Sequence, residues 1–262
     1  MVDTTKLPFG KAIAEDEIFN YGQLDELKLL LKLAIDERSI GLVSGQSGVG
    51  KTIGVHSVVS KLPANKYAVV YLGQDQNGSN LIRHLARGLG LPPKHFRPHS
   101  WMQIAQHLSD NLIEQGKTPV VVVDEAHLLD DATLEDLRLL TNTDFDRVSP
   151  IALIFLGQLP IRARLKAPGL EAISQRLRFR YALEGFSEEE TAAYIKHHLR
   201  LAGITEDLFT AEAVKQVFLA SGGLPREINN YGTMAVLKAR AGSLSSIDAK
   251  LIKQVLDQRE LN

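Results

Sequence analysis

The chain has 262 residues, and its 30 lysines and arginines nearly balance its 31 aspartates and glutamates, so its formal net charge is −1 at pH 7. Hydrophobic residues make up 44% and charged residues 23%, a composition that excludes a disordered tail or a coiled rod. There is no cysteine, which excludes a disulfide framework, a cysteine zinc site and a thiol nucleophile. At about 150 residues per domain, the length favours one large domain and one small one.

The apolar runs are short. The longest uninterrupted runs are six residues, at 67–72 and 151–156, whereas a helix that spans a membrane needs about 20. The N-terminal residues also lack the apolar stretch of a signal peptide. We therefore expect a cytoplasmic protein with no membrane span.

Five β-branched or apolar runs alternate with amphipathic stretches through the first two thirds of the chain. Strands that helices cover on both faces are typically continuous apolar runs, so the pattern predicts an α/β fold with a parallel sheet. The expected strands are 40–43, 67–72, 120–123, 151–156 and 177–183. The expected helices are 23–37, 51–61, 79–90, 101–115 and 132–142.

The last third of the chain contains no further run that is typical of a strand. Ser187 is followed three residues later by Glu190, the spacing of a capping box that opens a helix to about Leu201. Further helices are expected over 210–220, from Pro225, and after Asp248. We therefore predict an α/β domain over 1–184 and a small helical domain over 185–262.

A phosphate-binding motif follows the first expected strand. Residues 45–52 read GQSGVGKT and match GxxxxGK[ST] between a strand and a helix. The motif predicts that Lys51 contacts the β- and γ-phosphates of ATP and that Thr52 ligates Mg²⁺. The other residues expected around the phosphates are Gly45, Gln46, Ser47, Gly48, Val49 and Gly50.

An acidic pair ends the third expected strand, where ligands bind in open parallel sheets. Asp124 is placed to hold Mg²⁺ through water, and Glu125 to activate a water against the γ-phosphate, which favours hydrolysis. Residues 124–127 also match a motif of a helicase superfamily, Asp-Glu-Ala-His. We reject that interpretation because only about 80 helical residues follow the first domain, too few for a second sheet domain. His127 is expected to be a loop residue near the site.

Three more polar residues occupy suggestive positions. Gln158 follows the fourth strand, where an amide can orient water or contact the γ-phosphate. Arg176 precedes the fifth strand and either reaches the nucleotide of a neighbouring subunit or lies solvated at the rim. Arg226 falls in the first turn of a helix, where a cation opposes the helix dipole unless an anion offsets it.

The order of GQSGVGKT, VVVVDEAH, LGQLP, SQRLRFRY and SGGLPREIN resembles an AAA+ ATPase. It is similar to the ExeA-like branch, which includes TniB- and TnsC-type transposition ATPases and the cytoplasmic part of ExeA secretion proteins. The resemblance runs from about Pro8 to Gln254. It implies a five-stranded sheet domain with a helical lid, ATP at a subunit interface, and assembly into a ring or helical filament.

The same resemblance assigns roles to several residues. It implies that Gln158 is sensor 1, Arg176 the arginine finger and Arg226 sensor 2. It also implies that adenine lies against the segment before the P-loop, near Phe19, Asn20 and Tyr21, which can equally be packing residues.

A basic segment suggests a nucleic-acid partner. From Gln76 to Ser109 there is no aspartate or glutamate. The segment contains Arg83, Arg87, Lys94, Arg97, Trp101 and four histidines. Phosphate contacts by lysine and arginine drive sequence-independent DNA binding, and Lys94 and Arg97 flank a loop that can project from the sheet domain. The alternative is an ordinary basic helix face, with Trp101 in the core.

A stand-alone core with no membrane span or wall-binding region after it favours a mobile-element helper over a secretion protein. We therefore expect an ATPase that binds double-stranded DNA when loaded with ATP and Mg²⁺, and that directs a transposase. Two alternatives remain. One is a secretion-associated ATPase without DNA binding. The other is a nucleotide kinase, which the Asp124-Glu125 pair and the absence of an arginine-rich lid insertion disfavour.

Overall fold

The computed structural model describes residues 8–10, 13–73, 78–114, 116–142 and 148–260. The chain divides into two compact units. The sheet unit comprises 22–47 and 51–183, and the helical unit comprises 1–21, 48–50 and 184–262. No helix in the described part of the chain combines the length and the apolar composition that crossing a bilayer requires.

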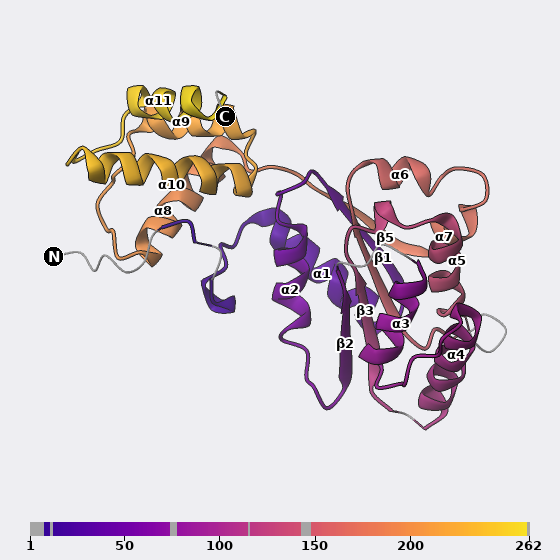
Figure 1. Cartoon of the computed structure of the whole chain (residues 1–262). Helices are drawn as coiled ribbons and strands as arrows, with labels where there is room; N and C mark the ends of the chain where they lie inside the picture. The colour runs from indigo at the N-terminus through magenta and orange to yellow at the C-terminus, as the bar shows by residue number, and fades with distance from the viewer. Residues whose placement is uncertain (1–7, 11–12, 74–77, 115, 143–147, 261–262) are drawn as a thin grey trace. The chain divides into compact units, whose positions relative to one another are not determined.

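The sheet unit is built on five parallel strands (Figure 1). They are β1 (Ile40–Gly45), β2 (Tyr67–Leu72), β3 (Thr118–Val123), β4 (Ala152–Gly157) and β5 (Leu177–Leu183). Their order in the sheet is β2-β3-β4-β1-β5. Every residue of β1, β3 and β4 is buried, which explains why these strands consist almost wholly of apolar and small residues. The predicted α/β fold with a parallel sheet is confirmed.

Helices cover both faces of this sheet (Figure 1). On one face α1 (Gly22–Asp36) and α2 (Lys51–Val59) pack against β1, β3 and β4. The opposite face carries α3 (Gly78–Gly88), α4 (Arg97–Ile113), α5 (Asp131–Leu139), α6 (Pro160–Arg164) and α7 (Glu171–Arg176). Two short 3-10 helices, η1 (Glu15–Glu17) and η2 (Ala126–Leu128), complete the elements before β5.

The largest differences from the prediction concern two short helices and the start of α4. The short helices α6 and α7 were not expected, because five or six residues are too few for a periodic apolar pattern to show. Helix α4 begins at Arg97 and not at 101, so Arg97, expected to flank a loop, is the first residue of a helix. Pro98 is compatible with the earlier start, since proline is tolerated in the first turn of a helix.

The helical unit consists of α8 (Glu188–Leu201), α9 (Ala211–Ser221), α10 (Pro225–Ala241) and α11 (Ala249–Glu260). The predicted capping box is present, because Ser187 Oγ accepts from the Glu190 N–H at 3.1 Å and a Glu190 carboxylate oxygen accepts from the Ser187 N–H at 3.0 Å. Gly223 lies so close to the backbone of Phe186 that an added Cβ would come within 2.1 Å of the Phe186 carbonyl oxygen. The backbones of the two segments that lead into α8 and α10 are therefore in contact.

Candidate functional site

The loop after β1 adopts backbone conformations that favour glycine. Gly48 has a φ of +82° and Gly50 a φ of +103°, both in the left-handed region that glycine enters without steric cost. Helix α2 begins directly after the loop, at Lys51. A glycine-rich loop at the N-terminus of a helix presents backbone N–H groups and a partial positive charge, the arrangement that holds a phosphate.

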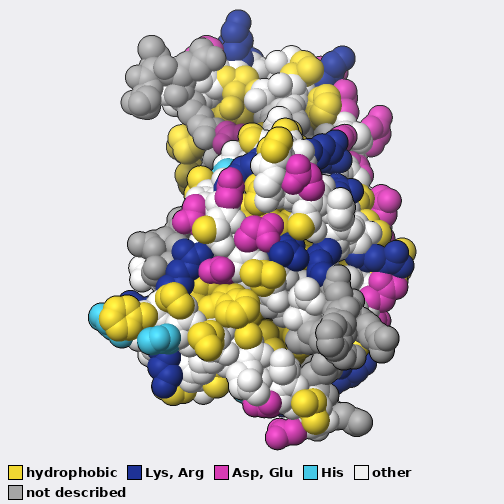
Figure 2. Space-filling model, turned by 90° about the vertical axis from the view of Figure 1, so that its right-hand side faces the viewer, with side chains coloured by type: hydrophobic (Ala, Val, Ile, Leu, Met, Phe, Trp, Pro, Cys, Tyr) yellow, Lys and Arg dark blue, Asp and Glu magenta, His cyan; other side chains and the backbone are white. Residues whose placement is uncertain are grey.

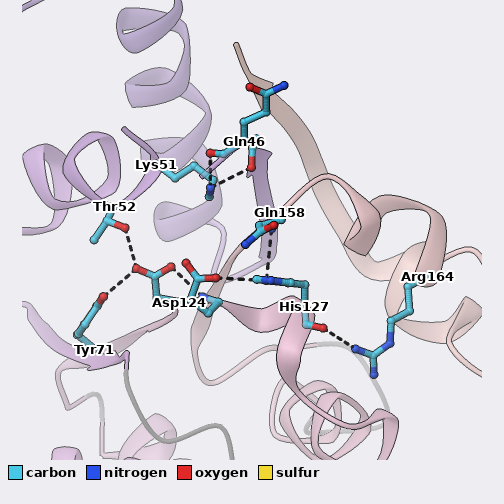
Figure 3. Close-up of polar contacts among 10 residues, drawn as sticks. Gln46, Lys51, Thr52, Tyr71, Asp124, His127, Gln158 and Arg164 are labelled. Carbon is cyan, nitrogen blue, oxygen red and sulfur yellow. Dashed lines mark hydrogen bonds and ion pairs between the residues drawn. The ribbon is translucent and has the colours of Figure 1, made fainter. Parts of the chain in front are cut away.

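The Lys51 side chain points back into this loop (Figure 3). Its Nζ donates to the carbonyl oxygens of Gly45 and Gln46, each at 2.9 Å. Lys51 is only 6% exposed. A buried ammonium held by carbonyl dipoles suits an incoming anion, because charge-assisted hydrogen bonds to phosphate are about twice as strong as neutral ones.

The carboxylate of Asp124 is held by three donors (Figure 3). Its Oδ2 accepts from Thr52 Oγ1 at 2.7 Å and from Tyr71 Oη at 2.8 Å, and its Oδ1 accepts from the Glu125 N–H at 2.8 Å. Asp124 is buried at the carboxyl end of β3. The predicted metal-binding pair, Thr52 and Asp124, therefore lies in direct contact although 72 residues separate the two in the chain.

These oxygens fit a magnesium ion. Mg²⁺ prefers oxygen ligands and is held by one or two carboxylates together with substrate phosphates. The Thr52 hydroxyl and the Asp124 carboxylate supply such oxygens beside the phosphate-binding loop. Thr52 is exposed as a residue, and the bond that its hydroxyl donates to Asp124 is partly buried.

Tyr71 is a site residue that sequence analysis missed. It is the fifth residue of β2, and burial together with the hydrogen bond to Asp124 raises its pKa well above the usual range, so the hydroxyl stays protonated and donates. A Cβ on Gly73 would come within 2.3 Å of the tyrosine ring. In the sequence, Tyr71 is marked only by its place near a strand end and by a glycine two residues later. This pattern is too common to predict a site residue by itself.

Glu125 has an unusual backbone conformation for a non-glycine residue. Its φ is +50° and its ψ +33°, which turns the chain from β3 into η2. The Glu125 side chain is 40% exposed, and its Oε2 lies 3.5 Å from Nδ1 of His127. Left-handed conformations outside glycine concentrate at functional sites, where the surroundings enforce them.

Gln158 and His127 meet at the ends of two neighbouring strands. The backbone N–H of Gln158, the residue after β4, donates to Nδ1 of His127 at 3.4 Å. Sequence analysis placed both residues near the site, and the structure joins them by this bond (Figure 3).

The two arginines assigned by resemblance lie on different units. Arg176 is the last residue of α7, and its Nη1 donates to Thr141 Oγ1 at 3.5 Å. Arg226 is exposed in the first turn of α10, in the helical unit. Their roles as arginine finger and sensor 2 stay predictions.

The segment expected near adenine packs within the helical unit. The rings of Phe19 and Tyr21 stack with centroids 6.0 Å apart, and both meet Phe186 edge to face, at 5.6 and 4.8 Å. Asn20, between them, is exposed. Phe19 and Tyr21 therefore contribute to packing in the helical unit. Adenine binding by Asn20 and Tyr21 stays a prediction.

The two residues expected to bind DNA differ in their surroundings. Lys94 is exposed between α3 and α4. Arg97 contacts α5 through two bonds, since its Nε donates to Asp136 Oδ2 and its Nη2 to Thr133 Oγ1, each at 3.0 Å. Trp101 packs against the core, as one alternative had it, and its Nε1 donates to the Asp136 carbonyl at 3.0 Å.

Phe96, which precedes Arg97, is exposed despite its size. It is 62% exposed, and its ring meets His95 and His99 edge to face. Figure 2 views the sheet unit from the side that carries α3, α4 and α5 and shows histidine, hydrophobic and basic side chains gathered at one edge of this face. The face is therefore mixed in character and not uniformly basic.

This geometry defines a class of protein: a P-loop nucleotide-binding fold, with the phosphate loop after β1 and the acidic pair after the neighbouring β3. Residues 34–165, just over half of the chain, match a family described as AAA domain. The chain belongs to this AAA domain family.

One curated relative stands out. The chain is 31% identical over 205 residues to the General secretion pathway protein A of Aeromonas hydrophila, an alignment that covers 76% of this chain and 37% of that protein. The chain thus matches little more than a third of the relative's length.

Solved structures share the fold at low sequence identity. Cdc6p of Pyrobaculum aerophilum has a TM-score of 0.65 at 16% identity, covering 94% of this chain and 67% of that one. The ORC1 protein of Aeropyrum pernix, solved in complex with DNA, has a TM-score of 0.65 at 13% identity, covering 96% and 67%. The RuvB branch migration motor of Thermotoga maritima has a TM-score of 0.57 at 16% identity, covering 89% and 68%. The likeness to TniB- and TnsC-type ATPases stays a prediction.

Proposed function

We propose that this chain is a magnesium-dependent ATPase that binds duplex DNA in its ATP-bound state and, as a ring or helical filament, recruits or activates a transposase. The observation that carries the ATPase part is the contact between Thr52 and Asp124 at 2.7 Å, beside the buried ammonium of Lys51. A hydroxyl, a carboxylate and a lysine in this arrangement provide oxygen ligands for Mg²⁺ and a cation for phosphate.

Each residue of the site has a defined task in this proposal. Lys51 and the glycine-rich loop bind the phosphates, and Thr52 and Asp124 hold Mg²⁺, which neutralises charge on the phosphate oxygens when bound. Glu125 accepts a proton from the attacking water. Its carboxylate is partly exposed, which leaves room for that water.

Three further residues act on the γ-phosphate. Gln158, at the end of β4, orients water or contacts the phosphate, and Arg226 senses the nucleotide from the helical unit. Arg176 acts on the nucleotide of a neighbouring subunit, where an arginine finger contributes about 10³–10⁵ in rate. Asn20 and Tyr21 lie against adenine.

The ATPase proposal is tested with Glu125→Gln. The substitution removes the base but keeps the size of the side chain, so we expect nucleotide affinity within about twofold of the wild type and a turnover lower by about 10²–10⁴, the usual contribution of a general base. ATP affinity and phosphate release are measured on the full chain. Wild-type turnover in the Glu125→Gln variant refutes the role of this residue, and a wild type that neither binds nor hydrolyses ATP refutes the proposal.

The DNA part of the proposal is supported by the segment from 76 to 109, which carries no carboxylate side chain. Lys94 is its exposed lysine. Arg97 is paired with Asp136, but ion pairs that are partly exposed contribute only about 0–1 kcal/mol. A phosphate can therefore recruit Arg97 at small cost, and Lys94, which has no ion pair among the described residues, carries no such cost.

A salt titration of duplex binding, with a non-hydrolysable ATP analogue, tests the DNA contact. We expect Lys94→Ala to weaken binding to all duplex sequences alike and to flatten the dependence of log affinity on log salt by about 0.9. Lys61→Ala is the matched control, because Lys61 is an exposed lysine just after α2, which covers the other face of the sheet. Equal slopes for both variants refute the site, and no binding by the wild type at low salt refutes the DNA proposal.

The second candidate function is a secretion-associated ATPase that does not bind DNA. The 31% identity to the General secretion pathway protein A favours it. The two candidate functions share the ATPase chemistry. The salt titration of duplex binding distinguishes them, since a secretion-type ATPase shows no salt-dependent duplex binding.

A further inference from the structure

His127 lies between two residues of the proposed ATPase site and is held there by its backbone. It is the middle residue of η2, and its carbonyl oxygen accepts from Nη1 of Arg164 at 3.0 Å. Arg164 is in turn anchored to Asp131 of α5 through its Nε at 3.1 Å. The His127 side chain is 13% exposed. The backbone of His127 is therefore anchored, and its imidazole ring is largely shielded from solvent.

The end of β4 packs directly against this segment. A Cβ added to Gly157 would lie 3.5 Å from the His127 backbone nitrogen and 3.2 Å from the Ile161 side chain. The bond from the Gln158 N–H to His127 Nδ1 extends this contact to the ring. A small movement of the residue after β4 thus reaches the imidazole without any intervening group.

One ring nitrogen serves two partners. Nδ1 lies 3.4 Å from the Gln158 backbone nitrogen and 3.5 Å from Glu125 Oε2. A neutral imidazole carries its proton on one nitrogen only. When Nδ1 is unprotonated, it accepts a hydrogen bond from the Gln158 N–H and cannot donate one to the Glu125 carboxylate. When Nδ1 carries the proton it donates to Glu125, and the Gln158 N–H loses its partner.

We propose that His127 is a positioning residue that couples the γ-phosphate-sensing end of β4 to the base Glu125 by exchanging these two partners. With Nδ1 bonded to Gln158, the Glu125 carboxylate is released toward the attacking water. With Nδ1 bonded to Glu125, the carboxylate is withdrawn. This inference rests on the proposed ATPase function. It needs no change of net charge, because the two neutral tautomers of the ring are sufficient.

Three substitutions separate this role from simple packing. Asparagine places a polar atom near the position of Nδ1, glutamine places one near Nε2, and leucine keeps bulk without a polar atom. We expect His127→Asn to keep turnover within about threefold of the wild type, and His127→Gln and His127→Leu to lose about tenfold or more, since misplaced catalytic groups cost that much or more. ATP affinity is expected to stay within about twofold in all three, because the ring binds no phosphate.

A second measurement does not depend on turnover. Hydrogen exchange at the Gln158 amide, read without nucleotide, is expected to be slow in the wild type and in His127→Asn and faster in His127→Gln and His127→Leu, because only the first two offer an acceptor at the Nδ1 position. Exchange and turnover that are the same in all three variants overturn the proposal, as does a His127→Asn variant that behaves like His127→Leu.

Failure of this inference is distinguishable from failure of the proposed function. If the wild type hydrolyses ATP, Glu125→Gln lowers turnover as expected and the three His127 variants do not differ, only the role of His127 is refuted. If the wild type does not hydrolyse ATP, the ATPase proposal is refuted and the role of His127 falls with it.

Discussion

Replacing His198 by leucine is expected to make the helical unit less sensitive to acid. His198 is 2% exposed on α8, and its Nε2 has no hydrogen-bond partner in the described part of the chain. Its ring stacks on Phe9 with centroids 5.3 Å apart and lies 4.4 Å from the ring of Tyr194. Burial and the neighbouring His197 lower the pKa of His198 from 6.5 to about 4.

The sign follows from proton binding in the two states. The folded chain keeps His198 neutral down to about pH 4, whereas the unfolded chain protonates it below about pH 6.5. The unfolded state therefore binds more protons between these values, and the free energy of unfolding falls as the pH falls through this window. With these two pKa values, this histidine costs about 2 kcal/mol at pH 5, about 3 kcal/mol below pH 4, and nothing at pH 8.

Urea unfolding followed by far-ultraviolet circular dichroism at pH 8 and pH 5 measures this difference. The loss of stability between the two pH values is expected to be smaller by about 2 kcal/mol in His198→Leu than in the wild type. Tyr194→Phe is the control, because it perturbs the same aromatic cluster and leaves His198 in place, so its pH dependence is expected to match the wild type. An equal loss in wild type and His198→Leu refutes the reasoning.

Three further predictions concern the site and the DNA contact. Lys51→Ala is expected to weaken ATP binding by about 10- to 100-fold in equilibrium titrations, because hydrogen bonds to charged groups contribute about 1.5–3 kcal/mol, and unchanged affinity contradicts the P-loop assignment. Arg176→Ala mixed with Glu125→Gln protein is expected to regain some hydrolysis, since an interface that joins an intact Arg176 to an intact Glu125 site then exists, and no recovery in demonstrably mixed oligomers argues against the finger. Asp136→Asn removes the carboxylate paired with Arg97 and is expected to strengthen duplex binding in the salt titration, whereas unchanged affinity shows that Arg97 does not contact DNA.

The fold was predictable because local patterns and burial agree in this chain. Strands β1, β3 and β4 are buried along their whole length, so their sequences are apolar or small throughout and are visible without the structure. The order β2-β3-β4-β1-β5 was not predicted, since no local pattern tells which strands become neighbours. That order places β3 and β4 beside each other, and the residues that follow them, Asp124 and Gln158, therefore belong to one edge of the sheet.

The site residues that belong to a nucleotide-binding motif were predictable from the sequence. The contacts that depend on which elements become neighbours in the fold were not. The pairing of Thr52 with Asp124 follows from two motifs, and the structure shows the bond at 2.7 Å. Tyr71 and His127 enter through contacts that no spacing encodes, Tyr71 across two neighbouring strands and His127 between η2 and the end of β4. Each of them contacts a motif residue. Tyr71 belongs to no motif, and the motif that contains His127 does not indicate its contact with Gln158.

The basic segment shows that a charge pattern in the sequence does not determine the charges around each side chain in the fold. The absence of carboxylates between 76 and 109 is a property of the chain, whereas the electrostatic potential at a side chain depends on its neighbours in space. The fold brings Asp136 of α5 to 2.8 Å from the guanidinium of Arg97, so one of the two predicted DNA contacts has a carboxylate partner that the sequence window does not contain. Lys94, which remains exposed between α3 and α4, is for this reason the stronger of the two candidates. A duplex that binds this surface must compete with Asp136 for Arg97, whereas Lys94 has no ion pair among the described residues, so the loss of Lys94 is expected to weaken binding more than the loss of Arg97.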